Sequence, residues 1–237
     1  MAGIIDFHSH VLPGIDDGSR SLEESIAMLR MEAEQGVSHV VATPHFYPRH
    51  DTPEHFLRKR REAEELLREE MEKHSDLPAL SVGAEVYYFP GISNSEAIFE
   101  LTINHGKCIL IEMPASPWTD AMYRELEGLY TKQGLIPIVA HVDRYVGRFR
   151  TFGIPRRLAE LPVLVQANAE AFLKKSSSAM AFRLLKQNSI HLLGSDCHNL
   201  HSRQPNLRAA LERIERRLGS APLAAIQECQ AYALQSE

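Results

Sequence analysis

Cysteine is scarce in this sequence of 237 residues. Only Cys108, Cys197 and Cys229 occur, an odd number at wide spacing. A small secreted scaffold would need paired cysteines for its disulfides, and a zinc knot would need them as close together as in CxxC. The sequence therefore argues against both classes, and we expect a protein of the reducing cytoplasm.

Long apolar runs and an excess of basic residues are also lacking. No run approaches the roughly 20 residues of a membrane span, and the N-terminal MAGIIDFHSH has no signal-peptide pattern. The formal net charge of -5 disfavours nucleic acid and anionic membranes as partners. Since internal repeats and long linkers are missing too, we expect one domain over residues 1–237, with no nucleic-acid partner and no membrane insertion.

The sequence does contain a regular alternation of short apolar runs with amphipathic segments. This alternation predicts repeated βα units around a parallel sheet, and hence an α/β fold. The candidate strands are residues 3–7, 39–43, 79–84, 108–111, 136–140, 163–167 and 191–194. The candidate helices are residues 22–33, 54–74, 120–133, 179–187, 206–218 and 221–234. Ser21 and Glu24 have the spacing of a capping box for the first helix, and Thr52-Pro53 precedes the second.

Residue types that bind metals follow nearly all of these strands. They are His8 and His10 after IIDF, His45 after VVATP, Glu85 after LSVGA, Glu112 after ILI, His141 after IVA, and Asp196 and His198 after HLLGS. The carboxyl ends of barrel strands meet at one face, where barrel enzymes build their active sites. A single histidine after a strand is usually structural, but this repetition predicts a metal site.

The spacing within two of these motifs suits a shared ion. In His8-Ser9-His10, residues i and i+2 lie on one side of an extended chain, so both imidazoles can face one metal. Asp196 and His198 repeat that spacing. Mixed nitrogen and oxygen ligands suit Mn, Fe or Zn better than Ca or Mg. Because eight candidates exceed the needs of one tetrahedral ion, two or three ions sharing a bridging carboxylate are expected.

The motifs HSHVLPGIDDG, TPH, GAE, IEMP, AHVDRY and SDCHN resemble those of the polymerase-and-histidinol-phosphatase (PHP) superfamily. More closely, they resemble its bacterial metal-dependent protein tyrosine phosphatases of capsule and exopolysaccharide operons. The similarity runs from residue 4 to about residue 205. It implies a distorted TIM-like β/α barrel of about seven strands that binds three divalent metal ions, with Mn²⁺ expected first and Fe or Zn as alternatives.

The resemblance also divides the ligands among the ions. The first ion would take His8, His10, Glu85 and Asp196; the second would share Glu85 and take Glu112 and His141; the third would take Asp17, His45 and His198. Spacing alone does not distinguish Asp17 from Asp16. The sequence departs from the family pattern at Val142, Asp143 and Gln204, which leaves substrate preference open.

The activity implied by the resemblance is hydrolysis of phosphotyrosine on an autophosphorylating tyrosine kinase that regulates polysaccharide export. A hydroxide held between two metals would be the nucleophile, since bound cations lower the pKa of water to about 7. Arg144 and Arg203 match arginines of the family pattern. They are the candidate catalytic residues, because a guanidinium binds phosphate through two parallel hydrogen bonds.

Three other interpretations compete with this one. Cys197 and Arg203 have the C-x5-R spacing of thiol phosphatases, although the intervening HNLHS lacks the glycines such a loop favours. A PHP enzyme could instead act on a small phosphate such as histidinol phosphate, or on a nucleic-acid end. The third alternative is a non-catalytic PHP binding module.

Several remaining basic residues receive a structural interpretation. The histidines of this group are His39, His50, His55, His74, His105, His191 and His201. Of these, His201 could touch substrate. The arginines at 148, 150, 156 and 157 form either a solvated basic segment or a surface that attracts an acidic phosphotyrosine tail.

Overall fold

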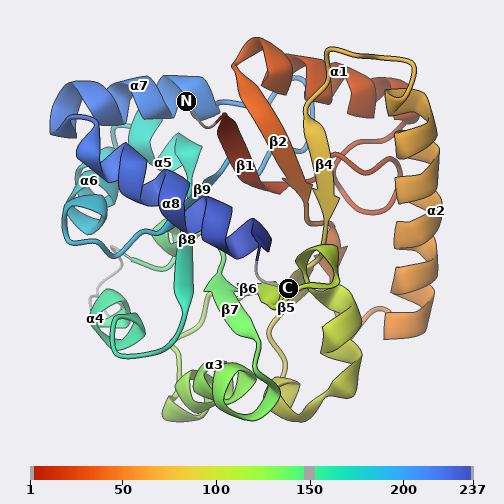
Figure 1. Ribbon diagram of the computed structural model, residues 1–237. Helices are drawn as coiled ribbons and strands as arrows, with labels where there is room; N and C mark the ends of the chain where they lie inside the picture. The colour runs from red at the N-terminus through yellow and green to blue at the C-terminus, as the bar shows by residue number, and fades with distance from the viewer. Residues whose placement is uncertain (1–2, 147–152, 236–237) are drawn as a thin grey trace.

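The computed structural model describes residues 3–146 and 153–235. The strands are β1 (Ile4–Ser9), β2 (Val37–Ala42), β3 (His45–Phe46), β4 (Ala79–Val82), β5 (Glu85–Tyr87), β6 (Cys108–Glu112), β7 (Ile136–Val139), β8 (Leu164–Asn168) and β9 (Leu192–Gly194). Their ladders are parallel and follow the orders β1-β2-β4 and β3-β5-β6-β7-β8-β9. The helices surround this curled sheet (Figure 1).

All seven predicted strands are present, and two of them are broken near their carboxyl ends. The short strands β3 and β5 continue β2 and β4 after breaks at residues 43–44 and 83–84. Hydrogen bonds from Gly83 N to Ala42 O and from Glu85 N to Pro44 O, both 2.9 Å, carry the pairing across the breaks. At the other edge, a parallel bridge between Ser9 and Cys197 links β1 to the segment after β9. The prediction of a distorted β/α barrel is therefore confirmed.

Close packing explains two glycines of the sheet. A Cβ atom at Gly83 would lie 2.9 Å from Cγ1 of Ile103, and a Cβ at Gly194 would lie 2.5 Å from Cβ of His8. Real side chains do not approach so closely, so these positions accept only glycine without a shift of the backbone. Gly194 thus allows β9 to lie directly against the part of β1 that carries His8.

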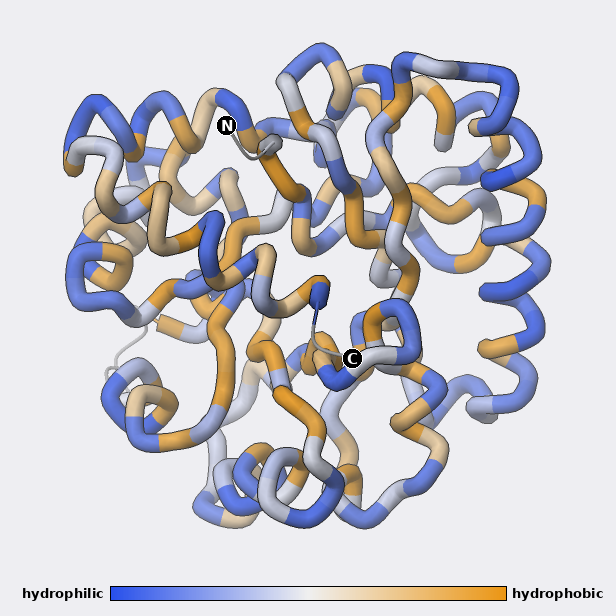
Figure 2. The backbone as a smooth tube through the Cα atoms, viewed as in Figure 1, coloured by the Kyte–Doolittle hydropathy of each residue, from blue (hydrophilic) through white to orange (hydrophobic). Residues whose placement is uncertain are grey.

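The core has two layers on opposite faces of the sheet. Along β6, Cys108 and Leu110 belong to one buried cluster, whereas Ile109 and Ile111 belong to the other, which also contains the buried faces of the helices. This alternation is expected for a strand covered on both faces. Figure 2 shows the strands as mainly hydrophobic and the outer helix α2 as mainly hydrophilic.

The helices are α1 (Leu22–Glu34), α2 (Pro53–Met71), α3 (Asp120–Gln133), α4 (Ile154–Leu158), α5 (Ala169–Leu173), α6 (Ser178–Lys186), α7 (Leu207–Leu218) and α8 (Ala221–Gln235). The 3₁₀ helices are η1 (Ile92–Asn94), η2 (Glu96–Leu101), η3 (Ile103–His105) and η4 (Val142–Arg144). The six predicted helices are confirmed, although α2 ends three residues before the predicted residue 74. The sequence did not predict α4 and α5, because five residues are too few to show a helical period.

Caps set the starts of two helices as expected. The hydroxyl of Ser21 accepts from Glu24 N, and that of Thr52 accepts from His55 N. No helix among the described residues is both long and apolar enough to cross a bilayer. The extent of a single domain over residues 1–237 stays a prediction.

Candidate metal centre

The predicted ligands converge around one buried carboxylate, that of Glu85 at the start of β5. Its Oε2 lies 2.9 Å from His45 Nδ1, 3.2 Å from His8 Nε2 and 3.4 Å from His10 Nε2. Its Oε1 lies 2.8 Å from His141 Nε2. Three other strands, β1, β3 and β7, thus deliver four imidazoles to the two oxygens of one side chain.

The remaining candidates extend the cluster on either side of Glu85. Asp196 Oδ1 lies 3.6 Å from His8 Nε2 and 3.5 Å from His10 Nε2. Glu112 Oε1 lies 3.7 Å from His141 Nε2. His198 Nε2 lies 3.4 Å from Asp17 Oδ1. Hence the structure brings together all nine predicted residues.

Ligand atoms gather into three overlapping groups, each with its atoms within 4.8 Å of one another. The groups are His10, Asp17, His45 and His198; His8, His10 and Glu85; and His45, Glu85 and Glu112. The division implied by the family resemblance differs in detail, since it assigned Asp196 to the first ion and His141 to the second. The number of ions stays a prediction.

The structure distinguishes the two aspartates of the IDDG motif. Asp16 accepts a hydrogen bond from His10 Nδ1 at 2.7 Å and two more from the backbone N–H groups of Gly18 and His45. Asp17 instead lies 3.5 Å from His45 Nε2. Asp16 therefore orients a candidate ligand from behind, as the partners of metal-bound histidines usually do, and Asp17 faces the centre.

Two candidate ligands have strained backbones. His141 has φ of 31° and Asp196 has φ of 54°, in the left-handed region that favours glycine. Such conformations persist only where the surrounding structure imposes them, and they are concentrated at functional sites. Both follow the end of a strand, so the left-handed turn directs His141 towards Glu85 and Asp196 towards His8 and His10.

The charges of the cluster fit a site for cations. Burial tends to raise the pKa of Glu85, but the neighbouring histidines, His8 first, hold this pKa well below its usual range. Burial and the nearby His10 lower the pKa of His198 to about 3, so its imidazole is neutral, as a metal ligand must be. Within the described part of the chain, Glu85 Oε2, Glu112 Oε2 and His198 Nε2 are buried and make no hydrogen bond. Bound cations would satisfy these atoms.

Strand β8 contributes two amides that the sequence analysis missed. Gln166 Oε1 accepts from His141 N at 2.5 Å and lies 3.4 Å from His8 Nδ1. Gln166 Nε2 donates to Asn168 Oδ1 at 3.0 Å, and Asn168 Nδ2 donates to Asp196 Oδ2 at 2.7 Å. The one predicted strand without a metal-binding residue type thus supplies the hydrogen bonds that orient three candidate ligands.

Two further buried acidic side chains, those of Asp6 and Glu32, lie behind the cluster. Asp6 accepts from His8 N at 3.2 Å and from Ser195 N at 2.8 Å, and it also accepts from the Ser195 hydroxyl. Burial and the adjacent Asp6 raise the pKa of Glu32, on α1, well above its usual range. Asp6 thus joins β1 to the segment after β9 at the point where both enter the candidate metal centre.

Cys197 belongs to this buried layer and not to the cleft. Its side chain is fully buried, with Sγ 3.8 Å from Glu32 Oε1. Burial, and then the charges of Glu32 and Asp6, raise the pKa of this thiol well above its usual range. A thiol phosphatase needs an accessible thiolate, so the geometry disfavours the C-x5-R interpretation.

The two candidate arginines lie at the rim of the cluster. Arg144 and Arg203 each donate to a different oxygen of Asp196, the latter at 2.8 Å. Asn199 Oδ1 accepts from the backbone N–H groups of Ser202 and Arg203, among others, and so orders the loop that presents Arg203. Both guanidinium groups are more than one-third exposed, which leaves them within reach of a bound anion.

The other basic residues lie outside the cluster. His39 pairs with Ser81, and His191 Nδ1 accepts from Val165 N, as their structural interpretation requires. Of the basic segment, Arg157 pairs with Asp120 at 2.7 Å. The arginines at 148 and 150 lie outside the described residues. Among the members of this set that the structure describes, His201, exposed in the loop after β9, lines the same cleft as the cluster.

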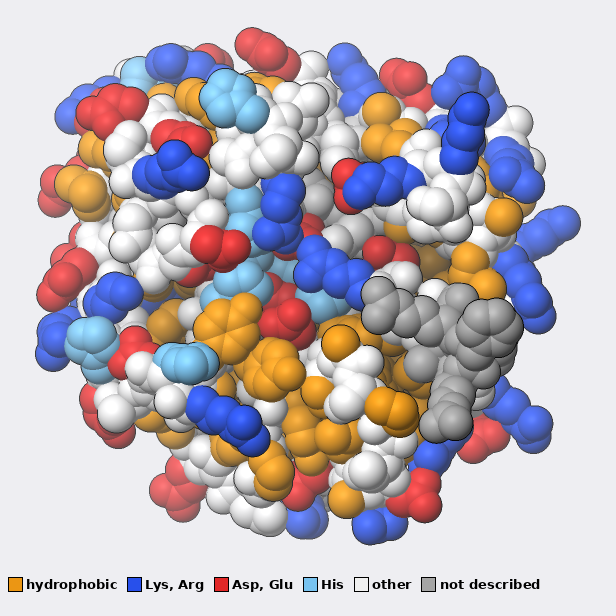
Figure 3. Space-filling view, turned by 180° about the vertical axis from the view of Figure 1, so that it is seen from behind, with side chains coloured by type: hydrophobic (Ala, Val, Ile, Leu, Met, Phe, Trp, Pro, Cys, Tyr) orange, Lys and Arg blue, Asp and Glu red, His pale blue; other side chains and the backbone are white. Residues whose placement is uncertain are grey.

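A cleft of about 1310 Å³ opens over the candidate metal centre. Figure 3 shows histidines and acidic side chains in a hollow of this face, with basic side chains beside them and hydrophobic side chains gathered below. One wall holds Tyr87, Met113 and Tyr145, from β5 and the segments after β6 and β7. A second wall holds Leu173 and Met180, from α5 and α6.

These features define a parallel β/α barrel with a candidate cation site at the carboxyl ends of its strands. Residues 4–233 match the family model described as capsular polysaccharide synthesis, CpsB/CapC, and the chain belongs to this family. It is 30% identical over 225 residues to the tyrosine-protein phosphatase YwqE of Bacillus subtilis, covering 92% of this chain and 86% of that protein. It is 28% identical over 232 residues to the tyrosine-protein phosphatase CpsB of Streptococcus pneumoniae, covering 92% of each.

A solved structure supports the same relationship. It comes from work on YwqE from Bacillus subtilis and CpsB from Streptococcus pneumoniae, described as unique metal-dependent tyrosine phosphatases. The match has a TM-score of 0.88 at 26% identity and covers 99% of this chain and 95% of that one. The resemblance inferred from the sequence motifs is therefore confirmed.

Replacing Gln166 by leucine tests the role of the β8 amides. We expect the affinity for Mn²⁺, measured by calorimetry, to fall roughly 10- to 100-fold, because His8 and His141 lose the group that orients them. The matched control is Gln230→Leu, since Gln230 is also buried but bonds to Ile5 O and Leu193 O, away from the cluster. Equal affinities of the two variants would contradict this role.

Proposed function

We propose that this protein is a metal-dependent phosphatase that hydrolyses phosphotyrosine in proteins. The observation that carries the proposal is the gathering of nine histidines and carboxylates, with the buried carboxylate of Glu85 at their centre, in a chain of the CpsB/CapC family. The proposed metal ligands are His8, His10, Asp17, His45, Glu85, Glu112, His141, Asp196 and His198. We propose three divalent ions, with Mn²⁺ first and Fe or Zn as alternatives.

Divalent cations held there would supply an activated water and would neutralise the oxygens of a phosphoryl group. The chain itself has to position the substrate. Arg144 and Arg203 stand on either side of Asp196 at the cleft, where their planar groups can bind phosphoryl oxygens in pairs. Glu85 and Asp196 repel an anion without bound cations, so the arginines and the metals must act together.

The leaving group of phosphotyrosine is a phenol, and the cleft offers it an aromatic surface. Tyr87 lines the cleft beside Glu112 and His141. The rings of Tyr87 and Tyr47 lie 5.6 Å apart, and Tyr47 stacks on His45 at 5.0 Å. This aromatic series runs outward from a proposed metal ligand, so we propose that the phenyl ring of the substrate packs against Tyr87.

The physiological partner that we propose is an autophosphorylating tyrosine kinase of the polysaccharide export machinery, acting in the cytoplasm. Membership in a capsular polysaccharide synthesis family supports this assignment. The acidic net charge of -5 speaks against nucleic acid as the substrate. A small phosphate such as histidinol phosphate is the alternative that an assay must address.

Metal removal and substrate choice together test the proposal. Chelation followed by dialysis should abolish hydrolysis of a phosphotyrosyl peptide, and Mn²⁺ should restore it, with elemental analysis recording the ions bound. We expect kcat/KM for the peptide to exceed that for histidinol phosphate at least 100-fold. Preference for histidinol phosphate would overturn the substrate assignment. A folded protein that binds no metal and hydrolyses neither compound would instead be a binding module.

The variant Cys197→Ser separates the metal mechanism from the thiol mechanism. Because the thiol is buried against Glu32 and away from the cleft, serine should retain activity to within about threefold while chelation still abolishes it. The measurement is kcat on a phosphotyrosyl peptide, with thermal unfolding as the check on folding. Loss of activity in a stable variant that still binds metal would favour the thiol mechanism.

Substitution of Tyr87 tests the aromatic surface. In Tyr87→Leu, we expect kcat/KM for phenyl phosphate to fall about 5- to 10-fold, because a ring–ring contact contributes about 0.5–1.5 kcal/mol beyond the buried area. Hydrolysis of an alkyl phosphate such as phosphoserine should change less than twofold, and Tyr87→Phe should behave as the parent. An equal loss on both substrates would mean that Tyr87 acts through the metal ligands.

A further inference from the structure

The cleft is larger than the proposed phosphotyrosine side chain requires. Its volume of about 1310 Å³ exceeds the roughly 300–1,000 Å³ typical of sites that enclose a small molecule. The candidate metal ligands His141 and Asp196 and the two arginines lie between its walls. The second wall, with Leu173 and Met180, lines the same cleft but holds none of the residues assigned to the phosphotyrosine.

The second wall consists of α5, α6 and the segment between them, which also places Ser176 and Ser177 in the lining. Leu173 and Met180 contribute half-buried apolar side chains, with Ala171 and Ala181 buried between the helices and the core. Lys174 at its edge is paired with Glu170 at 2.7 Å, so the wall carries little unbalanced charge. The wall is therefore suited to an apolar group and not to a second phosphate.

The loop after β9 adds polar side chains to the lining of the same cleft. Ser202 and Gln204 are exposed there, next to Arg203. Hydroxyl and amide groups of this kind can bond to a peptide backbone. Half-buried apolar side chains and exposed polar side chains, in one cleft with the candidate metal ligands, fit an extended polypeptide and not a free amino acid.

We propose that Leu173 and Met180 of this wall bind an aliphatic side chain of the substrate polypeptide within three residues of the phosphotyrosine. This inference rests on the proposed phosphatase function and adds the source of peptide selectivity. It makes Leu173 and Met180 specificity-determining residues that contact substrate but take no part in the reaction.

The test compares peptides with a minimal substrate. Seven-residue peptides carry phosphotyrosine at the centre of a Gly/Ser background, and one leucine is placed in turn at each of the three positions on either side. The minimal substrate is N-acetyl-phosphotyrosine amide. We expect leucine at one position or more to raise kcat/KM at least fivefold over the Gly/Ser peptide, mainly through KM.

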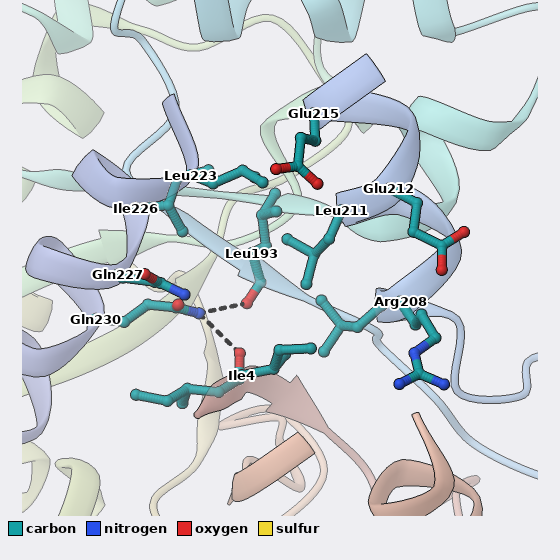
Figure 4. A pocket seen from close by; sticks show the side chains of 12 residues that line it. Ile4, Leu193, Arg208, Leu211, Glu212, Glu215, Leu223, Ile226, Gln227 and Gln230 are labelled. Atoms are coloured by element: carbon teal, nitrogen blue, oxygen red, sulfur yellow. Dashed lines mark hydrogen bonds between the residues drawn. The ribbon is translucent and has the colours of Figure 1, made fainter. Parts of the chain in front are cut away.

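The variants Met180→Ala and Leu173→Ala should abolish that fivefold gain. They should leave kcat/KM for the minimal substrate within twofold of the parent's value. The matched control is Leu211→Ala, because Leu211 is also half-buried but lines a separate cavity of about 240 Å³ between α7, α8 and the start of β1 (Figure 4). In that cavity Gln230 donates to Ile5 O and Leu193 O, far from the proposed ligands in the sheet. The control should keep the full gain.

The possible outcomes distinguish failure of the proposed substrate wall from failure of the proposed phosphatase function. If no leucine position changes kcat/KM, the wall does not bind substrate and the inference fails. The inference fails likewise if Met180→Ala lowers kcat/KM equally for the minimal substrate and for the peptides. If the metal-loaded parent hydrolyses neither the minimal substrate nor any peptide, the proposed function itself fails, and the inference fails with it.

Discussion

The burial of the Glu85 carboxylate among four imidazoles is the constraint on which the rest of the structure depends. A buried carboxylate without compensating charge is very costly, and here His8, His10, His45 and His141 approach its two oxygens. The ligands come from several strands, so the carboxylate can be satisfied only when those strand ends are in register. Protons on the histidines can supply part of the positive charge, but crowded imidazolium groups repel one another. Divalent cations would supply that charge without this repulsion, which links metal binding to the order of the strand ends.

Several irregular features of the fold follow from this requirement. The breaks after β2 and β4 restart the chain at His45 and Glu85, so two strands turn towards the centre at the residues that form it. His141 and Asp196 adopt left-handed backbone conformations for the same purpose. A regular parallel sheet would direct these side chains elsewhere. The stability given up at these positions is offset by the two-layered apolar core beneath them.

Local sequence pattern predicted the strands and eight of the nine residues that the structure gathers at the candidate centre; Asp17 came only from the family resemblance. An apolar run followed by a histidine or carboxylate is visible in the sequence, and the parallel topology brings such ends together. Gln166 and Asn168 were missed because an amide inside a strand has no distinguishing pattern. Glu32 was missed for a related reason: a glutamate in an amphipathic helix usually lies on the solvated face, and only the tertiary structure places this one against Asp6. The distinction between Asp16 and Asp17 likewise depends on the path of a turn, which spacing does not specify.

The centre cannot by itself select a substrate. Every phosphate monoester carries the same phosphoryl group, so cations and the two arginines would bind phosphotyrosine, phosphoserine and histidinol phosphate in much the same way. Selectivity has to come from contacts with the rest of the substrate, and therefore from the walls of the cleft. The wall at Tyr87 lies next to the proposed ligands Glu112 and His141, where its side chains can contact only the leaving group of the substrate. The wall at Leu173 and Met180 belongs to α5 and α6, two helices without proposed metal ligands, so its side chains can change without disturbing Glu85 and its partners. The proposed metal centre can therefore keep its chemistry while changes in this wall alter the preferred protein substrate.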